Sequence, residues 1–238
     1  PHVGFRPKGG RKLVVVRDAA RGPRTIALHD AARMNTQRPG APLLQRPLEE
    51  RASDFGPALV ADITDLETPG LYQLVVGEER SVPFFVRDDV WRRLLPKLVG
   101  YVTQQRCGTE VPFVHGACHL DDALRRDDGR RLDTTGGWHD AGDVRKWMAH
   151  TLWLGIGLVQ LLRAIPRPRA GDVTHEAILA ELRWGNGYFL KMQDADGAVF
   201  ADVGGGRNGD NSDNHFTDNR PGTRDDRHVN VDKRPAIA

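Results

Sequence analysis

Residues 136–143 read Gly-Gly-Trp-His-Asp-Ala-Gly-Asp and place two carboxylates, those of Asp140 and Asp143, three positions apart. The glycines permit backbone conformations that other residues avoid. If both aspartates lie on one turn, their carboxylates can face one cavity, hold a water molecule and remove its proton, which is the general-base half of an inverting glycoside hydrolysis. The alternative is a helix start, with an aspartate as N-cap after a glycine-rich entry. Spacing by itself favours the helix start.

Four potential metal ligands lie before and within this stretch: Cys107, Cys118, His119 and His139. Two sulfur and two nitrogen ligands are a set that closed, structural zinc sites use. The spacing is not that of a zinc finger, and the adjacent Cys118 and His119 need an irregular backbone, because a strand would point them apart. The alternative is a Cys107–Cys118 disulfide with two bystander histidines, which an oxidising compartment would favour. Spacing leaves both alternatives open.

Helical periodicity surrounds this central stretch. Apolar side chains recur at helical spacing from Pro96 to Arg106, from Val144 to Ala164 and from Thr174 to Met192, which predicts three helices. Of the tryptophans, those on helical stripes are typical of a core, so Trp138, in the loop, is the one expected to contact a sugar ring.

Residues 203–232 are dense in Gly, Asn and Asp, which predicts a long loop and not a core. Their oxygen atoms could bind calcium, but the pattern matches an EF-hand loop poorly, and a solvated polar loop is the favoured interpretation. The candidate calcium ligands are Asp210, Asp213, Asp218, Asn208, Asn211 and Asn214.

The first part of the chain has a different texture. Short apolar runs at Leu13–Val16, Ala58–Ile63, Leu71–Val76 and Val82–Val86 are separated by Gly and Pro turns, which predicts a small β-sandwich. We therefore expect two domains, residues 1–87 with β structure and residues 88–238 with helices.

Composition excludes several classes of protein. The chain of 238 residues is 39% hydrophobic and 28% charged, which is enough apolar material for a core. Its 34 basic and 32 acidic residues are interspersed, so no nucleic-acid partner is indicated, and no apolar run is long enough to span a membrane. The chain opens with Pro1 without a signal-peptide pattern and ends without a helix stop, so we expect it to be cut at both ends.

Three segments together resemble the opening of a glycoside hydrolase family 9 catalytic domain: residues 101–108 (YVTQQRCG), residues 115–123 (HGACHLDDA) and residues 136–143. Lys191-Met192-Gln193 with Asp196-Gly197 is similar to that family as well. The preceding half, including Val3–Pro7 and Pro69–Tyr72, resembles the immunoglobulin-like module that often precedes this domain. The resemblance covers nearly the whole chain.

The resemblance implies an immunoglobulin-like β-sandwich followed by the first helices of an (α/α)6 barrel, which is incomplete here. It implies an inverting endoglucanase or cellulase acting on β-1,4-glucan, with Asp143 as general base and Asp140 helping to hold the water. It implies a structural zinc ion on the four Cys and His ligands named above, so that His139 ties the metal to the aspartate loop. Calcium is common in the family, and these residues do not identify its ligands.

The sequence departs from the family in one respect. The family's general acid is a glutamate near the end of the catalytic domain, and neither Glu176 nor Glu181, which lie in an expected helix, matches its motif. We therefore expect this chain to be inactive alone, because loss of the acid costs about 10²–10⁴ in rate. An incomplete barrel should also expose apolar helix faces.

Two other functions fit less well. One is a non-catalytic, zinc-stabilised carbohydrate-binding or adaptor fragment. The other is a zinc-dependent hydrolase, which needs an open metal position that four protein ligands would fill. We expect a secreted or periplasmic monomer whose partner is a polysaccharide, β-glucan in the first place.

Overall fold

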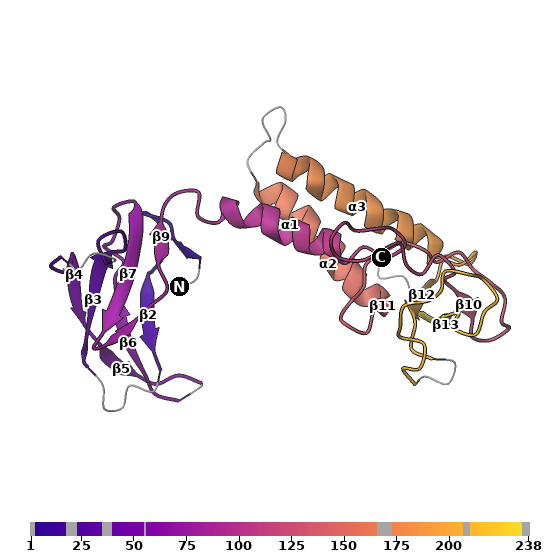
Figure 1. The fold of residues 1–238 in the computed structure, drawn as a ribbon, viewed down its shortest axis with the longest axis horizontal. Coiled ribbons are helices and arrows are strands. Elements are labelled where there is room, and N and C mark those ends of the chain that lie inside the picture. The colour runs from indigo at the N-terminus through magenta and orange to yellow at the C-terminus, as the bar shows by residue number, and fades with distance from the viewer. Residues whose placement is uncertain are drawn as a thin grey trace. The chain divides into compact units, whose positions relative to one another are not determined.

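The computed structural model describes residues 3–17, 23–34, 40–54, 56–165, 173–206 and 210–234, with residues 233 and 234 described by their backbone only. The chain divides into two compact units, Pro1–Leu95 and Pro96–Ala238 (Figure 1). Each unit has its own hydrophobic core, so each is described by itself.

The first unit consists of two β-sheets, at the residues where the apolar runs predict strands. The larger sheet has the order β1-β9-β7-β3-β4, with β8 paired to β7, and the smaller has the order β2-β6-β5. In the larger sheet the strands are β1 (Gly4–Phe5), β9 (Phe84–Val86), β7 (Gly70–Val76), β3 (Thr25–Asp30), β4 (Leu44–Pro47) and β8 (Glu79–Arg80). In the smaller sheet they are β2 (Leu13–Val16), β6 (Ala58–Asp62) and β5 (Glu49–Arg51).

One hydrophobic core joins these two sheets. Alternate residues of β3, Ile26 and Leu28, point inward and are buried, as are Leu74 of β7 and Leu59 of β6. Because successive side chains of a strand point to opposite faces, this alternation buries one face of each sheet. The unit is therefore a β-sandwich.

Three helices of the second unit form at the places where helical periodicity predicts them. They are α1 (Leu95–Gln104), which follows the short 3₁₀ helix η1 (Arg92–Leu94), α2 (Met148–Ala164) and α3 (Val173–Lys191). Their shared core contains Val99 and Val102 of α1, Leu158 of α2 and Ile178 of α3. The second helix begins at Met148 and not at the expected Val144, whose backbone has a φ of 52° and is not helical.

A small sheet in the second unit corrects the expectation of one long loop over residues 203–232. The order is β10-β13-β12-β11, with β10 (Leu124–Arg125), β13 (His228–Arg234), β12 (Val199–Val203) and β11 (Lys146–Trp147). β13 pairs antiparallel with β12 and parallel with β10. Val229 of β13 is fully buried in the core beneath this sheet, so the last part of the segment 203–232 contributes to the core and is not a loop.

Several apolar side chains on the helices of the second unit are open to solvent. Tyr101 of α1 is 61% exposed, and Trp153 and Ile156 of α2 are 69% and 40% exposed. This confirms the expectation of exposed apolar helix faces. In the part of the chain that the structure describes, no helix is both long and apolar enough to cross a bilayer.

Candidate metal centre and carboxylate loop

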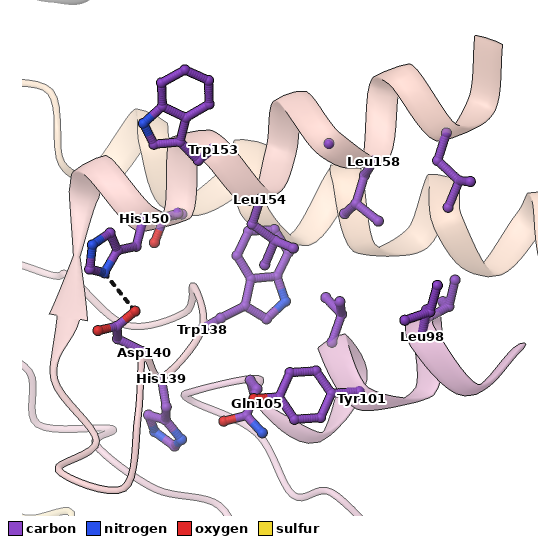
Figure 2. A pocket seen from close by; sticks show the side chains of 15 residues that line it. Leu98, Tyr101, Gln105, Trp138, His139, Asp140, His150, Trp153, Leu154 and Leu158 are labelled. Atoms are coloured by element: carbon purple, nitrogen blue, oxygen red, sulfur yellow. Dashed lines mark hydrogen bonds and ion pairs between the residues drawn. The ribbon is translucent and has the colours of Figure 1, made fainter. Parts of the chain in front are cut away.

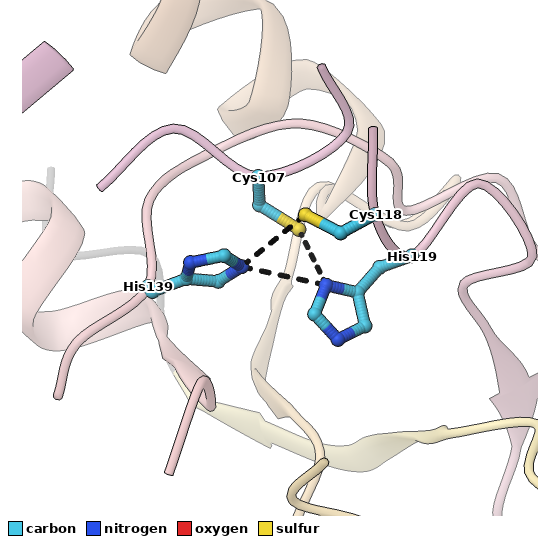
Figure 3. A group of neighbouring side chains, drawn as sticks. All are labelled: Cys107, Cys118, His119 and His139. Carbon is cyan, nitrogen blue, oxygen red and sulfur yellow. Dashed lines mark hydrogen bonds between the residues drawn. The ribbon is translucent and has the colours of Figure 1, made fainter. Parts of the chain in front are cut away.

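The four predicted metal ligands lie together in the second unit. One ligand atom from each of Cys107, Cys118, His119 and His139 lies within 4.8 Å of the others, and all four residues are buried. Both cysteines are free thiols, so the structure does not support the alternative of a disulfide. The two sulfur atoms and the facing imidazole nitrogens point toward one centre (Figure 3).

The spacing of these ligand atoms fits a tetrahedral zinc ion. The Cys107 Sγ to His119 Nδ1 distance is 3.4 Å, and Cys118 Sγ lies 3.7 Å from His139 Nε2. The two imidazole nitrogens are 3.4 Å apart. Zinc bonds of about 2.0–2.3 Å in a tetrahedron separate the ligand atoms by about 3.3–3.8 Å. The donor set is closed, which is the arrangement of a structural site.

Protonation at the cluster also suits a metal. The side-chain hydrogen bond with Cys107 lowers the pKa of the Cys118 thiol to about 7, and burial lowers the pKa of His139. The His119 Nε2 atom lies 2.9 Å from the carbonyl oxygen of His215. Because a carbonyl only accepts, Nε2 carries the proton and Nδ1 is left free for the metal.

Backbone pairing brings Cys107 and His139 to the same place. The amide of His139 donates to the carbonyl of Gln105, and the amide of Cys107 donates to the carbonyl of Gly137. Gly137 has a φ of +73°, and a Cβ atom there would lie 2.7 Å from the ring of Tyr188. The glycine in the motif is therefore required both by its conformation and by close packing.

The loop that carries Asp140 and Asp143, which we call the carboxylate loop, follows His139 directly. Asp140 Oδ1 accepts a hydrogen bond from His150 Nδ1 at 2.7 Å, and the Asp140 amide donates to the carbonyl of Arg145. Asp143 is exposed, and one of its carboxylate oxygens lies 3.4 Å from the Arg145 amide. The interpretation as a capped helix start is wrong, because the N-cap of α2 is Trp147 without a side-chain cap.

A pocket of about 430 Å³ borders this loop, between α1 and α2. Its walls are mostly apolar, and Asp140, His139 and His150 form a polar end (Figure 2). Exposed Tyr101 and Trp153 also line it. An apolar pocket with a few convergent polar groups is the usual form of a ligand site.

Trp138 has a different environment from the open loop position expected for it. Its side chain is only 3% exposed and packs in the core of the three helices, although its ring contributes to the pocket wall. The indole Nε1 donates to Glu181 at 3.0 Å, and Arg106 Nε donates to the same carboxylate at 3.1 Å. The buried carboxylate of Glu181 therefore holds the Trp138 ring in place through a hydrogen bond. No pattern in the sequence predicts this role.

The position of Trp138 depends on Gly185 of α3. A Cβ atom on Gly185 would lie 2.2 Å from the indole, so we expect Gly185→Ala to displace the ring and destabilise the unit by about 1–3 kcal/mol. A Cβ atom on Gly187, in the same helix, would point into open space, so Gly187→Ala should stabilise by about 0.4–1 kcal/mol. Thermal unfolding of both variants checks this, and shifts of the same sign would contradict it.

A buried ionic cluster, which no pattern in the sequence predicts, contacts the backbone next to the carboxylate loop. The side chains of Asp122, Lys146 and Arg227 are all 0% exposed, with both cations 2.6–2.7 Å from Asp122 Oδ2. Burial alone would raise the pKa of Asp122, but the charges of Lys146 and Arg227 hold it well below its usual range. Arg227 also donates to the carbonyl of Val144 at 2.8 Å, which fixes the backbone beside Asp143.

Of the described candidate calcium ligands, Asn211 and Asn214 are joined by a hydrogen bond of 3.1 Å, and the aspartates have other partners. Asp213 is buried and accepts hydrogen bonds from the amides of Gly206 and His228, and Asp210 accepts from Ser212. Among the described residues, the Cys and His cluster is the one group of at least three Cys, His or acidic ligand atoms close enough to share a metal. Asn208 lies outside the described residues.

Comparison with known proteins identifies the family. The family model for Glycosyl hydrolase family 9 matches residues 91–238. A cellodextrinase from Butyrivibrio fibrisolvens is 30% identical in an alignment 162 residues long, which covers 60% of this chain and 29% of that protein. A single-mutant thermostable endoglucanase from Alicyclobacillus acidocaldarius superposes with a TM-score of 0.69 at 26% identity, over 96% of this chain and 42% of that one.

A solved structure described as a Zn-binding triple mutant of the family 9 endoglucanase J30 is also similar. It has a TM-score of 0.63 and 25% identity, over 96% of this chain and 44% of that one. This chain therefore spans less than half the length of each of the three proteins. Because the family model covers well over half of these residues, the chain belongs to glycosyl hydrolase family 9.

Proposed function

We propose that the protein is an inverting endoglucanase of the cellulase type that cleaves β-1,4-glucan. Asp143 is the general base, Asp140 positions the attacking water, and the general acid is a glutamate outside these 238 residues. The water attacks the anomeric carbon on the face opposite the leaving sugar while Asp143 takes its proton and the acid protonates the leaving oxygen. The observation that carries the proposal is that Asp140 borders a pocket in a chain of this family.

The geometry of the loop supports these roles. Asp140 and Asp143 lie on one short loop whose backbone is held by the Asp140–Arg145 hydrogen bond and by Arg227 on the Val144 carbonyl. Val144 has a φ of 52°, which is a rare conformation for a β-branched residue and one that clusters at functional sites. A catalytic base needs such a fixed position to hold its water.

The pocket supports a sugar chain as ligand. Tyr101 and Trp153 give it exposed aromatic surface, onto which the apolar faces of glucose rings can pack. Trp138 offers the edge of a buried ring. Asp140 and His150 supply the polar end that hydrogen-bonds hydroxyl groups.

The remaining parts have supporting roles. We assign residues 1–87 to an immunoglobulin-like module and residues 88–238 to the first part of an (α/α)6 barrel. A structural zinc ion, when bound, would cross-link the segments that carry Cys107, Cys118, His119 and His139. His139 precedes Asp140, so the cross-link holds the start of the carboxylate loop. A secreted or periplasmic monomer suits a polymeric substrate.

The role of Asp143 can be tested without the general acid. Fluoride leaves without protonation, so β-cellobiosyl fluoride needs only the base: water attacks the anomeric carbon, the carbon–fluorine bond breaks, and α-cellobiose forms. We expect the chain to release fluoride, and Asp143→Asn to slow release about 10²–10⁴-fold. A fluoride electrode gives the rate, and proton NMR gives the configuration of the first product.

The control is Asp128→Asn, which makes the same change at an exposed aspartate of the same unit and should leave the rate unchanged. Binding of cellohexaose is measured in parallel by calorimetry. Binding without any fluoride release would favour the non-catalytic fragment, and a β-configured first product would overturn the inverting mechanism.

A further inference from the structure

Phe216 packs against both imidazoles of the metal cluster. Its ring is stacked on His119, with 5.4 Å between centroids and 18° between planes, and stands edge-on to His139 at 5.9 Å and 90°. It also lies 6.2 Å from His115. Phe216 is itself 55% exposed, so it lies between the ligand rings and solvent, and the ring of His115, with its centroid 5.5 Å from that of His139, packs on the second ligand ring as well.

The residues around Phe216 bind the segment that carries two of the ligands. The carbonyl of His215 accepts from His119 Nε2 at 2.9 Å, and Thr217 Oγ1 donates to Asp121 Oδ1. Asn219 Oδ1 accepts from the Leu120 amide at 3.0 Å. Asn219 Nδ2 donates to the carbonyl of Ala117 at 3.1 Å. We call residues 215–219 the strap, because they tie down residues 117–121 along their whole length.

The ligand segment needs such support. His119 has a φ of +55°, the left-handed conformation that non-glycine residues rarely adopt. This conformation lets the adjacent Cys118 and His119 face one centre, which a regular strand would prevent. A sparsely populated backbone conformation persists only where its surroundings hold it, and the strap contacts both sides of His119.

We propose that the strap is a positioning element for the metal centre, in which Phe216 covers the two imidazoles and slows the escape of the metal. Metal leaves when a ligand ring turns away or when water and chelators reach the coordination sphere. Phe216 opposes both, and the His215 carbonyl holds His119 in the tautomer that binds through Nδ1. The inference rests on the proposed metal centre and not on the glucanase activity.

The test is the rate of zinc release from the zinc-loaded chain to an excess of a chromogenic chelator. Loss of a group that supports a metal ligand typically costs about 10–100-fold in metal affinity, so we expect Phe216→Ala to release zinc about 10–100-fold faster. Phe216→Leu, which keeps an apolar cover, should fall between. Phe113→Ala is the matched control, because it removes a phenylalanine ring that is fully exposed, and it should not change the rate.

A cobalt-substituted sample separates positioning from loss of a ligand. The absorption spectrum of Phe216→Ala should remain that of a tetrahedral site with two thiolates while its cobalt leaves faster. Should Phe216→Ala not fold, Asn219→Gly tolerates the left-handed backbone at this position (φ 63°), removes the side-chain hydrogen bonds at the far end of the strap and should also speed release. Release within twofold of the unchanged chain in both variants would overturn the inference. A chain that binds no zinc at all would instead overturn the metal centre itself.

Discussion

Removal of the metal, or Cys118→Ser, is expected to unfold the second unit, residues 96–238, and to leave the first unit folded. All four ligands lie between α1 and α2, outside the named helices and strands, and the three helices account for only part of the unit. Binding of structural zinc contributes about 10–16 kcal/mol in zinc-finger peptides, which equals or exceeds the whole stability of a typical domain, about 5–15 kcal/mol. Loss of the ion should therefore abolish the cooperative transition of this unit.

Elemental analysis and calorimetry together measure this effect. We expect one zinc ion per chain, lost in Cys118→Ser, and two unfolding transitions of which only that of the second unit disappears on chelation. The first unit contains no member of the cluster and acts as an internal control. Added zinc should restore the chelated chain but not the serine variant.

A different result would change the account of the site. A chain without zinc but with a Cys107–Cys118 disulfide would remove the metal centre and the strap inference. Zinc that leaves without any effect on unfolding would show that the fold holds the ligands unaided. In that case the ion would not hold the carboxylate loop in place.

Local signals in the sequence predicted the local structure. The helical spacing from Pro96 to Arg106 predicts a helix, and α1 covers Leu95–Gln104, with Leu98, Tyr101 and Val102 lining the pocket. The strand at Leu13–Val16 has the bounds that its apolar run predicts. The helical and the strand periodicity both depend only on residues close together in the chain, so a single sequence is enough to predict these elements.

Long-range partners explain what the sequence did not predict. The loop at Val144 is held by Arg227, 83 positions away, so the helical spacing that extends back to Val144 does not produce a helix there. Residues 228–232 of the expected polar loop belong to strand β13, whose partners are β12 and β10 and not adjacent residues, so no local pattern predicts the strand. Trp138 is buried because Gly185 leaves room for it, which no local pattern reveals.

The metal ligands were predicted by resemblance and not by spacing. Spacing left a disulfide and a zinc site equally open, and the structure brings the four side chains together with free thiols. The required irregular backbone is present at His119, with its positive φ. The strap that holds it comes from the polar segment, whose Asn and Asp residues signal turns but not their distant partners.

Asp122→Asn is expected to destabilise the second unit by about 3–5 kcal/mol, because it leaves the buried cations Lys146 and Arg227 without their anion. For a domain of this size, each kcal/mol lowers the melting temperature by about 2–4 °C. The expected fall is therefore on the order of 10 °C, measured by calorimetry on the zinc-loaded chain. The Val144 carbonyl should also lose its fixed donor, so fluoride release from β-cellobiosyl fluoride should slow.

The control is the same substitution in an exposed ion pair. Asp127 is paired with Arg125 and its side chain is 45% exposed, so solvent screens the pair and Asp127→Asn should lower the melting temperature far less than Asp122→Asn. Equal melting temperatures for the two variants would show that the buried cluster contributes no more than a surface pair. A large loss of stability in Asp122→Asn with an unchanged rate of fluoride release would separate the two roles: the cluster would stabilise the unit, and the carboxylate loop would hold Asp143 in place by its own hydrogen bonds.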